Sequence, residues 1–251
     1  MRRTLISILC AVMAFGSAAA LSACGSTSKT ESSSSSSSVP KTTEKAEFNM
    51  ANLFSVQYAD ADFAGYWKIS DGKGSQLESF VFEFDGKETA YMLAGTMGYF
   101  AKYSIKSEGG KNYFTTQMFG LDGTYSYTIS GDKKTITLTD TSDNSTSTLT
   151  KIDSYNSIPK TDGTEKIDDA LLGAWQDDTG EILYFDKSGV MLDLQKNISF
   201  TFYRCSAEKG NLTQTYLIKS ETTDTATYSV KGDTLTYNNY DYKRISENDI
   251  M

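Results

Sequence analysis

One short stretch occurs twice in the sequence, first as Asp60-Ala-Asp-Phe-Ala-Gly-Tyr-Trp67 and again as Asp168-Asp-Ala-Leu-Leu-Gly-Ala-Trp175. Glycine and tryptophan stand at the same places in both copies. Further landmarks follow each copy in the same order, which unrelated sequences rarely do by chance. The sequence therefore predicts a tandem duplication, with one folded unit at 58–153 and a second at 166–246, joined by a polar linker at 154–165 that contains Pro159.

The remaining landmarks begin with the parallel between Phe82-Glu-Phe84-Asp85 and Leu183-Tyr-Phe185-Asp186. Each unit then has a Tyr-x-x-x-Gly-Asp segment before an alternating strand, and each ends on a basic residue followed by isoleucine. These segments are Tyr127-Thr-Ile-Ser-Gly-Asp132 with 135–139 and Lys151-Ile152 in the first unit, and Tyr228-Ser-Val-Lys-Gly-Asp233 with 234–237 and Arg244-Ile245 in the second.

Within each unit the residue pattern is that of β-strands. Thr, Tyr, Phe, Val and Ile dominate, side chains alternate with period two as in 125–129, and Asp-Gly or Gly-Asp turns recur at short spacing. In the second unit we expect eight strands, near 173–177, 181–186, 189–194, 198–206, 212–219, 225–231, 234–237 and 241–246. A meander of short antiparallel strands loses its exposed edges when it closes into a barrel, so we predict an all-β fold of two small meander barrels. Helix is expected only as a short turn capped by Asp60 or Asp168 and as a brief segment near 49–58.

The arrangement resembles the lipocalin and calycin group, in particular the short lipocalin-like domains of secreted bacterial proteins. The resemblance is carried by the capped turn, the Gly-x-Trp that opens the first strand (Trp67 and Trp175), and the basic residue on the last strand (Lys151 and Arg244). In that group the basic side chain packs over the tryptophan and closes one end of the barrel. The resemblance therefore implies that Lys151 stacks on Trp67 and Arg244 on Trp175, as structural pairs. Lys151 departs from the more usual arginine, and units of about 80–95 residues fill an eight-stranded barrel with their own side chains unless the strands are long.

The first residues of the chain have the features of a secretory signal peptide. Arg2 and Arg3 precede an apolar run at 5–15, which is shorter than the roughly 20 residues of a transmembrane helix, and small residues follow. Leu21-Ser-Ala-Cys24 resembles the lipobox of bacterial lipoproteins, in which the cysteine receives diacylglycerol (thioether- and palmitate-type lipid) before cleavage. We expect a signal peptide at 1–23 and lipidation of Cys24; the alternative is ordinary cleavage that leaves Cys24 a free thiol.

Residues 24–47 are expected to form a disordered tether behind this anchor. They contain seven consecutive serines, Ser32–Ser38, and too few apolar residues to bury a core. A flexible chain of this length spans about 25 Å. The sequence thus predicts a protein held by lipid at the extracytoplasmic face of the cell membrane, with the membrane as its first partner.

Composition excludes several classes of function. The net charge of −8 and the lack of clustered Lys and Arg argue against nucleic-acid binding. The chain has no histidine, which removes His-based acid–base catalysis, Ser-His and Cys-His nucleophile pairs, and the usual zinc sites. The acidic pairs of the chain match no calcium-loop spacing. We therefore expect no enzyme, no metal and no cofactor, and an inert, half-buried Cys205.

Six residues are the candidates for lining a ligand site. Tyrosines could line a pocket or a sugar-binding face, although a half-buried tyrosine is ordinary on a sheet, and the irregular stretch around Gly95–Gly98 could form an apolar mouth. The candidates are Tyr125, Tyr127, Met97, Phe100, Tyr228 and Tyr237.

Two functions are consistent with these sequence features. The first is a non-catalytic, membrane-anchored binding protein whose lipocalin-like domains hold a small apolar ligand or a peptide. The second is a cell-envelope structural or interaction protein whose barrels are solid and whose outer surfaces contact protein or polysaccharide. A continuous apolar cavity of about 300 Å³ or more inside a barrel would favour the first, and a packed interior the second.

Overall fold

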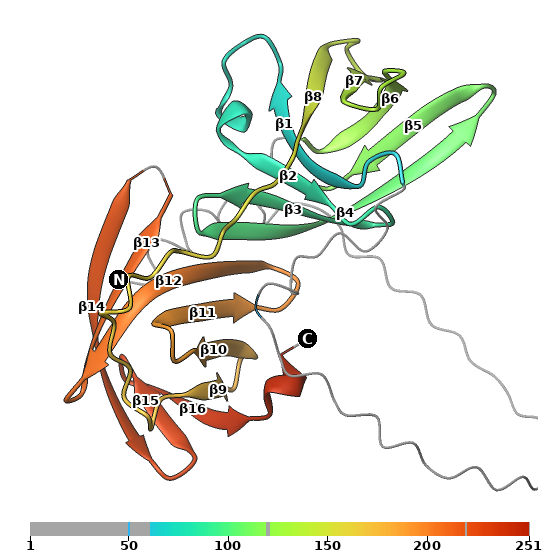
Figure 1. Ribbon diagram of the computed structural model, residues 1–251. Coiled ribbons are helices and arrows are strands. Elements are labelled where there is room, and N and C mark those ends of the chain that lie inside the picture. The colour runs from blue at the N-terminus through green and yellow to red at the C-terminus, as the bar shows by residue number, and fades with distance from the viewer. Residues whose placement is uncertain (1–49, 51–60, 119–120, 219, 251) are drawn as a thin grey trace, which may run out of the picture. The chain divides into compact units, whose positions relative to one another are not determined.

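The computed structural model describes residues 50, 61–118, 121–218 and 220–250, and these residues are mostly β-strand (Figure 1). The predicted signal peptide, Cys24, the serine-rich tether and Asp60 lie outside the described residues, as does all but Met50 of the helical segment expected near 49–58. The prediction of an all-β fold built from closed antiparallel meander barrels is confirmed.

The first barrel is a ring of eight strands in chain order. Each strand pairs antiparallel with the next, and β1 also pairs with β8, where Trp67 lies opposite Lys151. A 3-10 turn, η2 (Gln76–Ser79), joins the first two strands. The strands are β1 (Gly65–Ser70), β2 (Val81–Phe84), β3 (Thr89–Ala94), β4 (Met97–Glu108), β5 (Lys111–Thr116), β6 (Gly123–Ile129), β7 (Thr135–Asp140) and β8 (Thr146–Ile152).

The second barrel repeats this ring, with β9 paired to β16 and Arg244 opposite Trp175. The eight strands predicted for this unit are confirmed, with ends shifted by a few residues. The largest shift is at β14, which begins at Glu221 because its first residues pair with β13 although their side chains are exposed. The strands are β9 (Gly173–Gln176), β10 (Glu181–Phe185), β11 (Val190–Gln195), β12 (Ser199–Glu208), β13 (Asn211–Leu217), β14 (Glu221–Lys231), β15 (Thr234–Tyr237) and β16 (Tyr240–Ile245), followed by the 3-10 turn η3 (Glu247–Asp249).

Aromatic side chains fill the interior of the first barrel. Phe63, from the turn ahead of β1, stacks on Phe114 with ring centroids 4.8 Å apart, and it meets Phe84 and Tyr127 edge-on. Phe63, Trp67, Phe84 and Phe114 are all fully buried. Contacts of this kind add to the large apolar area that each ring removes from water, so the interior is a packed core.

The second barrel is filled in the same way. Its interior cluster contains Trp175, Phe185, Tyr237 and Tyr242, all essentially inaccessible, together with smaller residues such as Ala207. The Tyr237 hydroxyl donates a hydrogen bond of 2.6 Å to Gln214 Oε1, which keeps both polar groups satisfied inside the barrel.

A third cluster of buried side chains lies on outer strand faces and draws residues from both rings. All described residues belong to one compact unit, and β4 pairs with β12 through Gly98 opposite Phe200. A Cβ atom on Gly98 would lie 2.2 Å from the Phe200 ring, so this position needs glycine. Strand β2 is consequently buried on both faces: Phe82 and Phe84 point into the barrel, while Val81 and Glu83 face outward.

Candidate functional site

The two tryptophans occupy equivalent positions at the end of each barrel. Trp67 Nε1 donates to the Phe63 carbonyl and Trp175 Nε1 to the Leu171 carbonyl, both at 2.7 Å. Lys151 Nζ lies 5.4 Å from the centre of the Trp67 ring, within the range of a cation–π contact. The structure thus brings Lys151 and Trp67 together.

Arg244 makes a closer contact in the second barrel. Its Cζ lies 3.9 Å from the centre of the Trp175 ring, and its guanidinium donates to the carbonyls of Leu172 (2.7 Å) and Ala170 (2.9 Å). A Cβ on Gly173, whose φ is +99°, would lie 3.3 Å from the Arg244 Nη1 atom, so the glycine of the Gly-x-Trp motif makes room for the cation. Lysine at 151 cannot present the same planar fork of donors.

The four candidate tyrosines lie in the barrel cores. Tyr125 and Tyr127 belong to the interior cluster of the first barrel, and Tyr228 and Tyr237 to that of the second. Each is at most 7% exposed. They pack with the other aromatic residues of each interior and are not brought together around the pocket described below.

Met97 and Phe100 lie at the start of β4. Met97 pairs with Thr201 on β12, and Phe100 packs edge-on against Phe200 at 6.1 Å and against Tyr91 at 5.1 Å. The Gly95–Gly98 stretch therefore packs against β12 and Leu217 and is not an open mouth.

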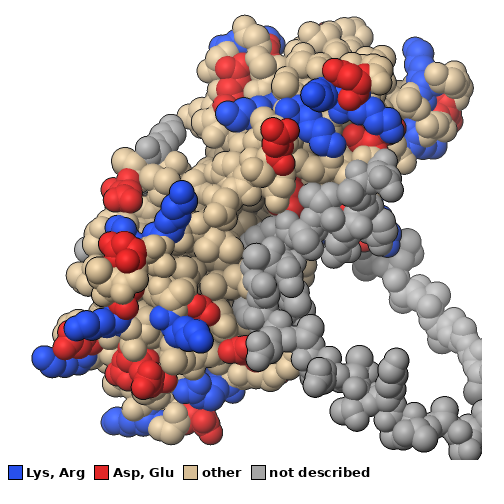
Figure 2. Space-filling view, viewed as in Figure 1, with Lys and Arg blue, Asp and Glu red and all other residues tan. Residues whose placement is uncertain are grey.

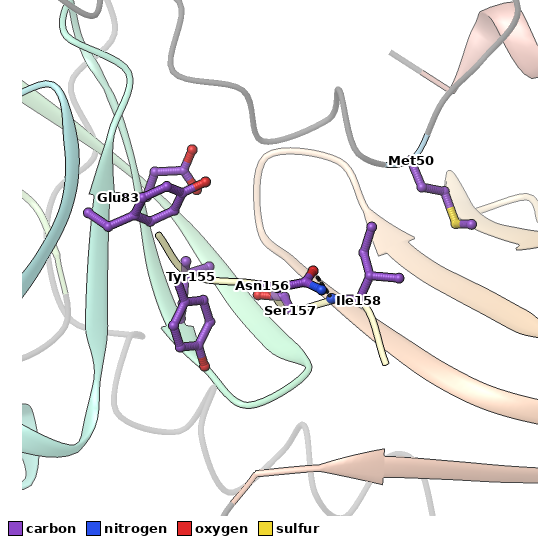
Figure 3. Close-up of a pocket in the computed structure, with 8 residues that line it drawn as sticks. Met50, Glu83, Tyr155, Asn156, Ser157 and Ile158 are labelled. Atoms are coloured by element: carbon purple, nitrogen blue, oxygen red, sulfur yellow. Dashed lines mark hydrogen bonds between the residues drawn. The ribbon is translucent and has the colours of Figure 1, made fainter. Parts of the chain in front are cut away.

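The structure instead has a pocket of about 220 Å³ against the outer face of the first barrel. Residues of the linker after β8 cover part of it, and the Tyr155 hydroxyl is held by a 3.1 Å hydrogen bond to the Gly95 carbonyl. Figure 3 shows Glu83 and Tyr155 on one side, Asn156 and Ser157 in the middle, and Ile158 and Met50 on the other. The full lining is Met50, Tyr66, Glu83, Leu93, Tyr155, Asn156, Ser157 and Ile158.

Glu83 is the one formally charged residue in this lining, and its side chain is 1% exposed. Neither carboxylate oxygen accepts a hydrogen bond of ordinary geometry, although the Tyr66 hydroxyl lies near enough to act against the rise in the pKa of the carboxyl. A buried polar group without a partner costs free energy, so such a group in a folded protein calls for an explanation.

Two tyrosines flank Glu83 on the same outer face. Tyr66 on β1 and Tyr91 on β3 are its direct cross-strand neighbours. Side chains at such positions have Cβ atoms about 5 Å apart, so the three form one row across the sheet.

Burial is the main cause of the raised pKa of the Glu83 carboxyl. It raises the pKa of Glu83 to about 8, with the nearby Asp85 charge adding to the effect and Tyr66 opposing it. Burial and the proximity of Glu83 likewise raise the pKa of Tyr66 to about 12. At neutral pH the Glu83 carboxyl is therefore mostly protonated, and a positive ligand would favour its ionisation.

The remaining reactive groups of the described residues give no second site. Cys205 is 2% exposed, more deeply buried than expected, and burial raises the pKa of its thiol to about 12. Among the described residues no group of three or more Cys, Asp and Glu could hold a metal ion. Over the same ranges, no helix has the length and apolar character needed to cross a membrane. On the face seen in Figure 2, Lys, Arg, Asp and Glu are interspersed.

The sequence reasoning missed Glu83, although one signal was present. Glu83 stands where the second unit has Tyr184, in the repeat landmark that pairs 82–85 with 183–186. Tyr184 has Ala174 and Leu192 as cross-strand neighbours, so the second barrel carries no acid at this point. The signal is a charged residue between two core phenylalanines. The second unit has an aromatic residue at the same position.

Neither a protein-family model nor a curated protein sequence matches the chain.

Proposed function

We propose that this protein is a non-catalytic binding protein, held by lipid on Cys24 at the extracytoplasmic face of the membrane, and that its ligand occupies the Glu83 pocket outside the barrel interiors. The observation that carries the proposal is the buried, unpartnered carboxyl group of Glu83 in the wall of that pocket. The lipoprotein features around Cys24 support the location.

Packing is the reason for placing the ligand outside the barrels. Trp67, Phe84 and Phe114 fill the first interior, and Trp175 and Tyr237 fill the second. A ligand inside would have to displace such side chains, and emptying the space of one buried aromatic residue costs about 3–5 kcal/mol. The tyrosines expected to line an internal site contribute to this packing.

A second candidate function is an envelope interaction protein whose outer surfaces contact a macromolecule. The same filled interiors favour it, because solid barrels leave recognition to their outer faces. It differs from the first candidate in needing no occupant for the Glu83 pocket.

Native mass spectrometry of the full-length protein distinguishes the two candidates. The protein is purified from membranes in a maltoside detergent and examined for a co-purified small molecule. Ser157, which is buried in the pocket lining, is replaced in a Ser157→Phe variant that fills the pocket; Ser188→Phe, on an exposed turn of the second barrel, is the matched control.

We expect a bound small molecule in the wild type and in Ser188→Phe, and its loss in Ser157→Phe. If the small molecule stays bound to Ser157→Phe, the ligand is not in this pocket. If no preparation carries one, and added small molecules do not bind, the second candidate replaces the first.

A further inference from the structure

Glu83 and the two tyrosines that line its pocket, Tyr66 and Tyr155, have the chemistry of a counter-ion site. We infer that the Glu83 pocket binds a small organic ammonium ion, with the Glu83 carboxylate as its counter-ion and tyrosine side chains against its alkyl groups. This inference rests on the proposed function and adds the chemical class of the ligand.

Charge complementarity is the first argument. The pocket lining contains no lysine or arginine, so nothing in it would pair with the Glu83 carboxylate once a proton is lost. Both carboxylate oxygens are buried and lack a hydrogen bond of ordinary geometry. An ionised carboxylate in such surroundings is stable only when a cation pairs with it, and here the cation has to come from outside the pocket lining.

The rest of the lining selects the kind of cation. A calcium ion takes six to eight oxygen ligands, and the pocket offers a single carboxylate. Thioether, aliphatic and aromatic surfaces make up most of the other walls, from Met50, Leu93, Ile158 and Tyr155. Such walls suit a cation that carries alkyl groups, because tyrosine rings attract ammonium ions through their faces while apolar walls cover the methyl or methylene groups.

Comparison of the two barrels supports the same conclusion. At the equivalent row of the second barrel the side chains are Ala174, Tyr184 and Leu192, which belong to an apolar cluster. The fold therefore does not need an acid here. The first barrel has an acid at this point, with a tyrosine on either side, so the row is specific to the first barrel.

The size of the pocket limits the ligand. A volume of about 220 Å³ is enough for a small organic ion and too small for a large one. Choline, with seven non-hydrogen atoms, is small enough to enter and is therefore a suitable probe. Its uncharged isostere 3,3-dimethylbutan-1-ol has the same shape and lacks only the positive charge.

Binding should depend on pH through Glu83. The groups that act on its carboxyl are Asp85, directly after β2, Tyr66 on β1 and Tyr91 on β3. Both tyrosines have a pKa of about 12 and stay neutral below pH 9. Choline keeps its charge at every pH, so a change in its affinity between pH 6 and 9 reports the ionisation of the protein alone.

The test measures dissociation constants by ligand-observed NMR of the probe's methyl signal. The full-length protein is held in a maltoside detergent, free of lipids and detergents that carry choline. We expect choline to bind at least about tenfold more tightly than 3,3-dimethylbutan-1-ol at pH 8.5, and to weaken as the pH falls to 6.

Three variants assign the effect to Glu83. Glu83→Gln should remove the preference for choline and its pH dependence, while Glu88→Gln, an exposed carboxylate at the turn before β3, should keep both. Asn156→Asp retains the oxygen that accepts the Ile158 backbone N–H, at 3.0 Å, and adds negative charge at the pocket. We expect it to strengthen choline binding by about two- to threefold. Circular dichroism and the fluorescence of the buried tryptophans confirm that each variant is folded.

Equal affinity for choline and its neutral isostere, or full affinity in Glu83→Gln, would overturn the ammonium inference and leave the proposed binding function standing. Weaker binding in Asn156→Asp would also count against it, because that variant disturbs no packed side chain. If neither probe binds and no small molecule co-purifies with the wild type, the proposed function fails together with the inference.

Discussion

Replacing Glu83 with glutamine should raise the stability of the folded protein at alkaline pH. Glu83 is buried without a hydrogen-bond partner, and its pKa rises from 4.5 to about 8 in the folded state. Folding therefore takes up a proton at this site between these two pH values. Because the native state binds the extra proton, the contribution of Glu83 to stability is fully present below pH 4.5 and is lost as the pH rises to about 8.

The size of the effect follows from the pKa difference. At 1.36 kcal/mol per pKa unit, a rise from 4.5 to about 8 corresponds to a loss of about 5 kcal/mol across this range. Rearrangement of the surrounding side chains around the ionised carboxyl reduces the cost, so we expect a measured loss of about 2–5 kcal/mol in the wild type. Glu83→Gln should lose almost none of its stability over the same range.

The composition of the chain allows a change in stability between pH 5 and 8 to be assigned to Glu83. No histidine is present to titrate between pH 5 and 8. The other described residues with shifted pKa values titrate outside that range: exposed aspartates such as Asp71 and Asp132 have lowered pKa values, whereas Tyr103 and Cys205 have raised ones. A fall in stability between pH 5 and 8 therefore reports Glu83.

The assay is urea denaturation of wild type, Glu83→Gln and Glu88→Gln at pH 5, 6, 7, 8 and 9. Circular dichroism follows the strands, and fluorescence follows the two buried tryptophans, so that separate unfolding of the two barrels is detected. Glu88→Gln should behave as the wild type does. A wild-type stability that stays level from pH 5 to 8, or that falls equally in Glu83→Gln, refutes the assignment of a buried, protonated carboxyl at this position.

Four further outcomes are expected. Arg244→Ala removes a cation–π contact and two hydrogen bonds at the end of the second barrel, and should lower the free energy of unfolding by about 2–4 kcal/mol in urea denaturation; a loss below 0.5 kcal/mol contradicts its closing role. Gly98→Ala places a Cβ against the Phe200 ring and should cost about 1–3 kcal/mol by the same measurement, and an unchanged midpoint would mean that this contact is absent. The peptide containing Cys205 should be alkylated by iodoacetamide only in urea, because the thiol is buried with a pKa of about 12, and rapid labelling of the native protein would disprove this. Cys24→Ser should release the protein from the membrane fraction, and continued membrane association would contradict lipid anchoring.

Much of the fold could be predicted because its signals are local. Period-two alternation and glycine-containing turns define each strand of the second barrel within a few residues, and the duplication shows that the first unit closes in the same way. The ends of strands were less predictable. Strand β14 extends to Glu221 through exposed Thr and Asp residues, which form a ladder only because β13 lies beside them.

The candidate site was not predictable in the same way. Glu83 alternates with Phe82 and Phe84, so its position on the outer face could be read from the sequence, but an outward-facing glutamate is ordinarily exposed. It is buried here because the cluster of outer-face residues and the linker at 155–158 cover it, and these residues are distant in the chain. No local sequence pattern indicates that distant residues cover Glu83.

The sequence alone predicted two β units that open on Gly-x-Trp, because strand alternation and a repeated motif depend on neighbours along the chain. The pairing of Lys151 with Trp67 and of Arg244 with Trp175 was implied by the resemblance to lipocalin-like domains. The tertiary structure shows which tyrosines fill a barrel and which face a pocket, and that Glu83 is buried without a hydrogen bond of ordinary geometry. Burial on the outside of a closed barrel depends on what packs against it from elsewhere in the chain, so the free energy of ionising Glu83 is a property of the assembled fold.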